Sequence, residues 1–166
     1  MISLQKITTQ FIDFEDRVRI SAVSSDNETL ILWLTQRLLI RVVKRCLTFL
    51  EEETNKPTQK SKHSGGNLEK QSTSIAPIEK AVSVKKNCRS LLIREVDLKY
   101  YQSRLSIVFR QDSENQASLE LNHLQLCQLM TIIFKVWHQA EWPIEVWPES
   151  INFLTDAETT SKIVLH

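Results

Sequence analysis

One pattern of strands followed by a helix occurs twice in this chain, in residues 2–53 and 89–140, and this repetition limits the folds open to it. The two copies align at a constant offset of 87 residues without a gap, so that Arg17 matches Arg104 and Leu32 matches Leu119. Chance similarity rarely keeps turn length, helix start and the phase of the apolar positions together. We therefore predict an internal duplication.

Within each copy the hydrophobic period changes from that of a strand to that of a helix. Apolar and polar residues alternate over two short stretches of each copy, which predicts half-buried strands at residues 17–24, 29–34, 105–110 and 117–121. Thr35 and Asn122 are residue types that favour helix N-caps, and an apolar stripe with helical spacing follows each of them. A leading strand is expected ahead of each pair, near residues 3–14 and 91–98.

Composition divides the chain into four parts, which are repeat unit one (1–53), a basic polar linker (54–87), repeat unit two (88–140) and a Trp-Pro-containing extended segment with a tail (141–166). The overall charge of +1 conceals a division, because the linker carries +5 while the parts before and after it carry −1 and −3. The linker is poor in apolar residues and contains the only two glycines, so we expect it to be disordered.

A unit of two or three strands and one helix cannot bury its apolar face alone, whereas two related units can share one core. We therefore predict an α+β fold in which two tandem ββ(β)α repeats form one compact domain. The strands would make a pseudo-twofold antiparallel sheet covered by the two helices.

Several classes of function find no support in the sequence. Gly65 and Gly66 lie in the linker, so neither repeat can form a glycine-rich phosphate loop. The three cysteines are widely spaced and form no C-x-x-C motif, which favours a reduced, cytoplasmic setting, and we expect neither a secretory signal nor a membrane-spanning segment. No nucleophile, base or metal-ligand set is specified, so we expect no enzyme, no cofactor, no metal and no small-molecule substrate.

Apolar residues outside the predicted core indicate a surface for a protein partner or a second copy of the chain. Ile31 and Trp33 face away from the core of repeat one, where repeat two has Ser118 and Glu120. Large apolar surface patches are typical of interfaces. The candidate contact residues are Ile31, Trp33, Leu124, Ile132, Val136, Trp142 and Trp147. Trp142 and Trp147 each precede a proline, and packing onto their own domain is the alternative to a partner contact.

A basic stripe on the first predicted helix indicates a second hypothesis. Arg37, Arg41 and Arg45 recur at a spacing of four, with Lys44 beside them, and could contact phosphates together with the basic linker. A solvated helix face is the alternative. Repeat two does not share this stripe, so nucleic acid would bind one half only.

The layout of strands followed by a helix, repeated once, resembles the PUR and Whirly nucleic-acid-binding architectures at the level of fold, and no motif of theirs occurs in this sequence. The favoured interpretation is a non-enzymatic interaction or assembly module that binds a protein partner or itself. The alternative is a nucleic-acid-binding module that uses Arg37, Arg41, Lys44 and Arg45.

Overall fold

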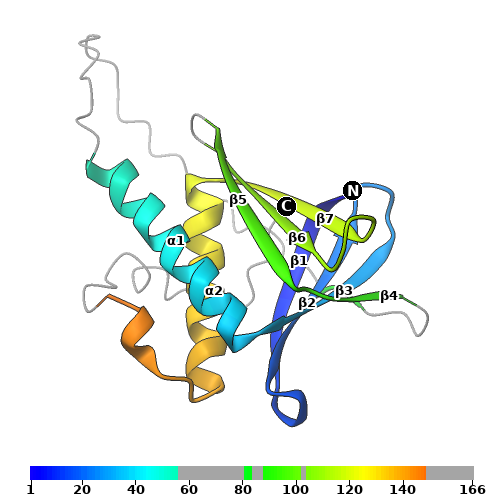
Figure 1. The fold of residues 1–166 in the computed structure, drawn as a ribbon, viewed down its shortest axis with the longest axis horizontal. Coiled ribbons are helices and arrows are strands. Elements are labelled where there is room, and N and C mark those ends of the chain that lie inside the picture. Colours follow the sequence, from blue (N-terminus) through cyan, green and yellow to red (C-terminus); the bar gives the residue numbers. More distant parts are fainter. Residues whose placement is uncertain (56–80, 84–87, 102–103, 149–166) are drawn as a thin grey trace, which may run out of the picture.

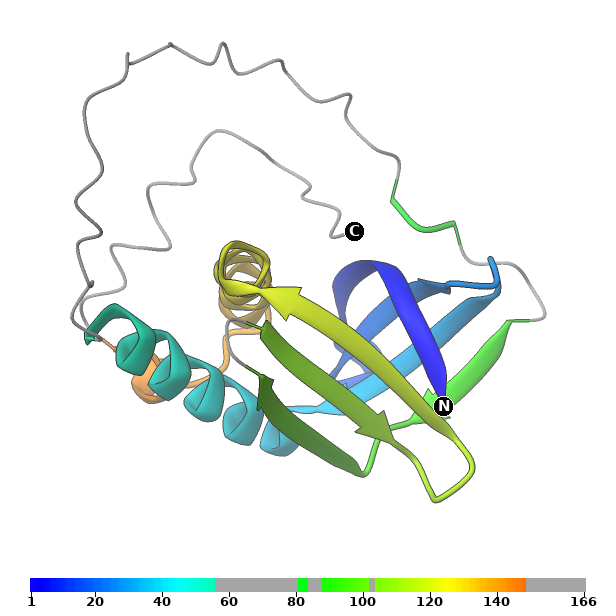
Figure 2. The same cartoon turned by 90° about the horizontal axis from the view of Figure 1, so that it is seen from above.

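A computed structural model describes residues 1–55, 81–83, 88–101 and 104–148. In this part of the chain a curled sheet of seven strands lies on one side and two helices lie together on the other (Figures 1 and 2). The strands are β1 (Ile2–Ile12), β2 (Arg17–Ser24), β3 (Thr29–Thr35), β4 (Arg89–Leu92), β5 (Glu95–Tyr101), β6 (Arg104–Arg110) and β7 (Gln116–Asn122). The helices are α1 (Gln36–Asn55) and α2 (His123–Gln139), with short 3₁₀ turns η1 (Asp13–Glu15) and η2 (Ile144–Val146).

The strand order is β4-β3-β2-β1-β7-β6-β5. Hairpin neighbours pair antiparallel, whereas β1 pairs parallel with β7 and β3 pairs parallel with β4. The α+β class with two helices is confirmed, and the prediction of a wholly antiparallel sheet is wrong. The parallel pairs arise because the strand that leads each half extends beyond its own hairpin and pairs with the last strand of the other half.

The leading strand of the second half is divided where the chain changes its pairing partner. It was expected as one strand over residues 91–98, but β4 pairs with β3 and β5 pairs with β6, at opposite ends of the strand order. In the link between them, the Ile93 amide donates to the Trp33 carbonyl at 3.0 Å and the Arg94 amide donates to the Arg110 carbonyl at 2.8 Å. The consecutive residues Ile93 and Arg94 therefore connect β3 to β6 by hydrogen bonds, and the sheet curls so that its two ends approach each other.

The predicted alternation of apolar residues is confirmed by their burial. Leu30, Leu32 and Leu34 of β3 are at most 1% exposed. Their counterparts on β7, which are Ala117, Leu119 and Leu121, are equally covered, and all six belong to one continuous core with residues from both helices. The strands thus present one apolar face to the helices, and burial of that face supplies the main driving force for folding.

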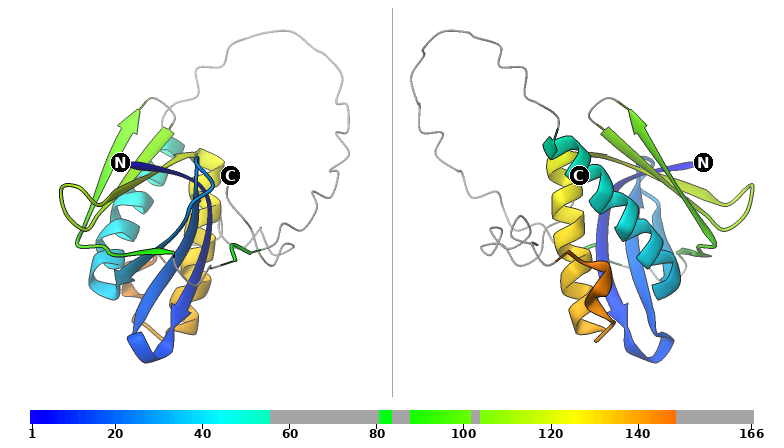
Figure 3. Two further views of the ribbon diagram at one scale, coloured as in Figure 1. Left: turned by 90° about the vertical axis from the view of Figure 1, so that its right-hand side faces the viewer. Right: turned by 60° about the vertical axis from the view of Figure 1, so that its left-hand side comes forward.

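The helices begin where the sequence predicts. The Leu38 amide donates to Thr35 Oγ1 at 3.4 Å, and Asn122 forms a capping box with Gln125. Each helix packs against the leading strand of the other half, α1 against β5 and α2 against β1, and the two helices also contact one another (Figure 3). The two halves are therefore intertwined through their helices.

The segment after α2 folds back onto the domain through its aromatic side chains. Packing of Trp142 and Trp147 onto their own domain was one of the two alternatives that the sequence left open. Trp142 and Trp147 lie edge-on against Trp137 at ring-centroid distances of 5.1 and 5.7 Å. The Trp142 indole N–H donates to Asp16 Oδ1 at 3.0 Å, and the Trp137 indole N–H donates to the Pro143 carbonyl at 2.9 Å. This segment contains η2 rather than being extended throughout.

Most of the linker and most of the tail lie outside the described residues. The predicted disorder of the linker concerns these residues and stays a prediction. Within residues 81–83, the Val82 amide donates to Thr8 Oγ1 on β1 at 3.0 Å. In the described part of the chain, neither helix combines the length and the apolar character needed to cross a bilayer.

The inward position of Leu32 yields a stability prediction. Leu32→Ala should lower the free energy of unfolding by about 2–5 kcal/mol, because it leaves a cavity in a fully buried part of the core. Ile31→Ala is the matched control on the opposite face of the same strand and should cost about 1 kcal/mol. Urea unfolding followed by far-UV circular dichroism measures both. Equal losses for the two variants would contradict the placement of the core.

Candidate binding groove between α1 and β5

A groove with a volume of about 500 Å³ lies between α1 and β5, which are adjacent in Figure 1. Its lining residues are Leu38, Arg41, Val42, Arg45, Arg94, Glu95, Val96, Asp97, Leu98 and Lys99. Val42 is buried and the other apolar members are half-buried, whereas the three arginines, Lys99 and Glu95 are exposed. The groove therefore has an apolar base and a predominantly basic rim.

The groove follows the edge of β5 rather than one of its faces. Consecutive side chains of a strand point to opposite faces, yet the consecutive residues from Arg94 to Lys99 all line the groove. Among the described strands, β5 pairs only with β6 and ends the strand order. Alternate amide and carbonyl groups of β5 consequently point away from the sheet, without a ladder partner among the described strands.

The charges of the groove do not cancel. Four cationic side chains line it, namely Arg41, Arg45, Arg94 and Lys99, against the carboxylates of Glu95 and Asp97. The Asp97 carboxylate pairs with Arg110, whose Nη2 lies 2.5 Å from Asp97 Oδ2. Because this ion pair neutralises one of the two acids, the local field attracts anions.

Tyr100 links helix and strand next to the groove. Its ring stacks on Phe49 of α1 with the centroids 4.4 Å apart, and its hydroxyl donates to the Arg45 carbonyl at 3.3 Å. Burial raises the pKa of Tyr100, so the phenol remains a hydrogen-bond donor at neutral pH. The stacked pair holds β5 beside α1 and fixes the spacing of the groove walls.

Four basic residues line the groove. Two of them were predicted from the stripe on α1, and the other two, Arg94 and Lys99, were not indicated by the sequence. Arg41 and Arg45 line the groove, Arg37 is exposed on α1 outside it, and Lys44 borders two smaller hollows against the segment after α2. Arg94 and Lys99 were missed, because both follow the linker, Arg94 in the bend before β5 and Lys99 on β5. Charge spacing along one helix cannot reveal a neighbour that tertiary packing supplies.

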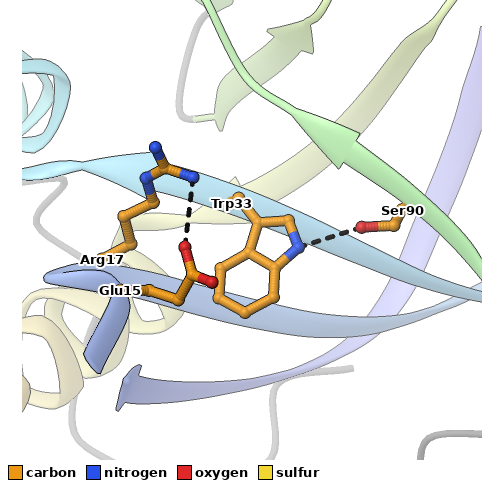
Figure 4. Close-up of polar contacts among 4 residues, drawn as sticks. All are labelled: Glu15, Arg17, Trp33 and Ser90. Atoms are coloured by element: carbon orange, nitrogen blue, oxygen red, sulfur yellow. Dashed lines mark hydrogen bonds and ion pairs between the residues drawn. The ribbon is translucent and has the colours of Figure 1, made fainter. Parts of the chain in front are cut away.

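The predicted partner residues of the sheet lie on the outer face of β3. Ile31 and Trp33 are half-buried, and the Trp33 indole N–H donates to Ser90 Oγ of β4 at 2.9 Å (Figure 4). Arg17 Nη1 and Glu15 Oε2, 3.5 Å apart, form an ion pair nearby (Figure 4). The chain itself therefore covers part of the Trp33 ring with β4.

The predicted partner residues of α2 and the following segment are not gathered into one exposed patch. Leu124 is 66% exposed, Ile132 is half-buried and Val136 is buried. Trp142 and Trp147 are each 7% exposed in the aromatic cluster described above. The two indoles thus leave little ring surface for a partner.

With this geometry established, the chain was compared with known proteins. No family model, curated protein or solved structure matches it. The case for a function therefore rests on the groove and its surroundings.

The burial of Cys46 beside the groove yields a reactivity prediction. Burial raises the pKa of the Cys46 thiol to about 12, so almost no thiolate forms at pH 8. Iodoacetamide at pH 8 should therefore leave Cys46 unmodified in the folded protein and modify it in urea. Peptide mass spectrometry measures the modified fraction. Alkylation of Cys46 at the same rate in both conditions would contradict its position on the buried face of α1.

Proposed function

We propose that this chain is a non-enzymatic interaction module that binds a protein partner in the groove between α1 and β5. The observation that carries the proposal is the coincidence in one groove of a sheet edge that no other described strand pairs with, an apolar base and a basic rim. A sheet edge offers backbone hydrogen bonds, the base offers apolar contact, and the rim offers charge complementarity. We place the protein in the cytoplasm, where its three unpaired cysteines suit a reducing environment.

As part of this proposal, we infer that the two halves arose by duplication. Strand registers support the inference: Arg17 pairs with Thr35 as Arg104 pairs with Asn122. The parallel registers agree as well, since Leu4 pairs with Leu119 as Leu91 pairs with Leu32. In each comparison, every residue of one half has its counterpart 87 positions away in the other half.

The duplication makes the groove specific to one half of the molecule. Its counterpart would lie between α2 and β1, where Gln128 and Ile132 stand in place of Arg41 and Arg45. That side lacks the basic helix stripe, so within the described residues the proposed module carries the groove in one half only.

The first test compares charge reversals on one helix. Arg41→Glu combined with Arg45→Glu should reduce retention of protein partners from a lysate by about tenfold, or about 1.4 kcal/mol, because two charges of the rim are inverted. Arg37→Glu combined with Lys44→Glu is the control, because it makes the same charge change on α1 outside the groove. Quantitative mass spectrometry of tagged variants measures retention. Equal retention by both variants would contradict the proposal.

Nucleic-acid binding is the second candidate, and the observation that favours it is a groove with four cationic side chains along a strand, β5, whose last residue, Tyr101, is 60% exposed. Aromatic rings beside basic residues are typical of single-strand binding surfaces. The lysines of residues 54–87, which lie largely outside the described part, would add phosphate contacts.

Fluorescence anisotropy of labelled single-stranded DNA and RNA, at low and moderate salt, decides between the two candidates. Under the preferred proposal, the intact protein shows only weak binding that ordinary salt removes. The nucleic-acid candidate predicts tight binding that weakens when the seven linker lysines are replaced by glutamine and when Arg41 and Arg45 are reversed. That result would overturn the preference for a protein partner.

A further inference from the structure

We propose that the ligand of the α1–β5 groove is an extended acidic peptide segment that pairs with β5 as an additional strand. This inference rests on the function proposed above and deepens it, because it names the conformation and the charge of the partner.

The edge of β5 supplies the backbone partner. β5 spans the seven residues Glu95–Tyr101, and its ladder is made with β6 alone among the described strands. An antiparallel ladder satisfies only half of the backbone groups of an edge strand, so every second residue of β5 has an amide and a carbonyl available on the groove side. An extended peptide can satisfy these groups by strand addition.

The side chains of the groove indicate the composition of that peptide. Residues of an added strand would point alternately to the two faces of the sheet. On the face of Val96 and Leu98, apolar side chains could contact the base formed with Leu38 and Val42. The exposed guanidinium groups of α1 and Arg94 would favour carboxylates elsewhere along the peptide. The chemistry therefore fits a segment in which apolar and acidic residues alternate.

The room in front of the edge favours a single strand over a folded partner. Because α1 lies along the groove, an occupant has to enter between a helix and a strand. A second copy of this chain would bring its own α1 and its own basic rim to the same place, and like charges would face each other. A nucleic acid would leave the β5 amides and the apolar base unused and would place phosphates beside Glu95.

The other half of the molecule provides a partial precedent. Thr8 on β1 is the counterpart of Glu95 at the offset of 87, and it accepts a hydrogen bond from the Val82 amide. A non-helical segment of the chain, residues 81–83, thus already lies beside the matching strand, with a backbone amide bonded to a side chain of β1. The groove beside β5 has no such contact from the described residues.

The experiment uses the full chain and fluorescein-labelled nonapeptides, with binding measured by anisotropy. The probe alternates valine and aspartate. One control carries lysine in place of aspartate, and a second keeps the probe's side chains but is N-methylated at alternate backbone nitrogens, which prevents pairing with a strand edge. We expect the probe to bind, and both controls to bind at least about tenfold more weakly.

Arg41→Gln combined with Arg45→Gln should weaken binding of the probe by a similar factor, whereas Arg37→Gln combined with Lys44→Gln should not.

Hydrogen exchange locates the bound probe. Alternate amides of β5 should exchange more slowly in the complex, while those of β2, which is paired on both sides, should not change. Failure of the probe to bind, or slowed exchange confined to another strand, overturns the inference.

Two further outcomes separate this inference from the proposed function. Equal binding of the N-methylated peptide and the probe overturns strand addition, while groove-dependent retention of protein partners would still support the interaction module. A dimer in sedimentation analysis that is lost on Arg41→Gln with Arg45→Gln overturns the acidic peptide in favour of a second copy. Oligonucleotide binding that depends on the same two arginines, without peptide binding, overturns both proposals.

Discussion

The link between β4 and β5 is the contact on which the architecture of this protein depends. The Ile93 amide donates to the Trp33 carbonyl of β3, and the Arg94 amide donates to the Arg110 carbonyl at the end of β6. These two adjacent hydrogen bonds tie opposite ends of the sheet to one another, so an open ribbon becomes a curled sheet with a defined inside. The inside is apolar and faces the helices, and the core is enclosed as a consequence.

The same link explains why a groove exists. Because β5 departs from β4 to pair with β6, it becomes the last strand of the order and keeps one edge unpaired by other described strands. The helix of the first half lies beside this edge and contributes Arg41 and Arg45, while the bend itself contributes Arg94. The proposed site is thus produced by the exchange of packing partners between the halves, and neither half contains it alone.

The sequence predicted those features that one-sided burial imposes. Alternation at Leu30, Leu32 and Leu34 located β3 and its buried face, and the side chains of Thr35 and Asn122 located the starts of the helices. These signals are local, because strand and helix periods follow from backbone geometry.

The remaining features depend on contacts between residues far apart in the chain. The parallel pairs β1–β7 and β3–β4 bring together strands from the two halves. The spacing of apolar residues along the sequence carries no information about such pairing. The groove combines Arg41 with Lys99, and the linker separates these two residues in sequence. The prolines beside Trp142 and Trp147 marked a change of direction, and only the aromatic packing around Trp137 shows that both rings turn inward.

The parallel pairing of β1 with β7 also orders events during synthesis. The residues Ile2 to Leu4 of β1 are translated well before their partners Ala117 to Leu119, which follow only after the linker and most of the second half have been made. Until then the first half can form its hairpins, but its apolar inner face has neither α2 nor the second set of strands to cover it. A nascent chain of this kind passes through an aggregation-prone interval, and the length of that interval is set by the time needed to translate the linker and the second half.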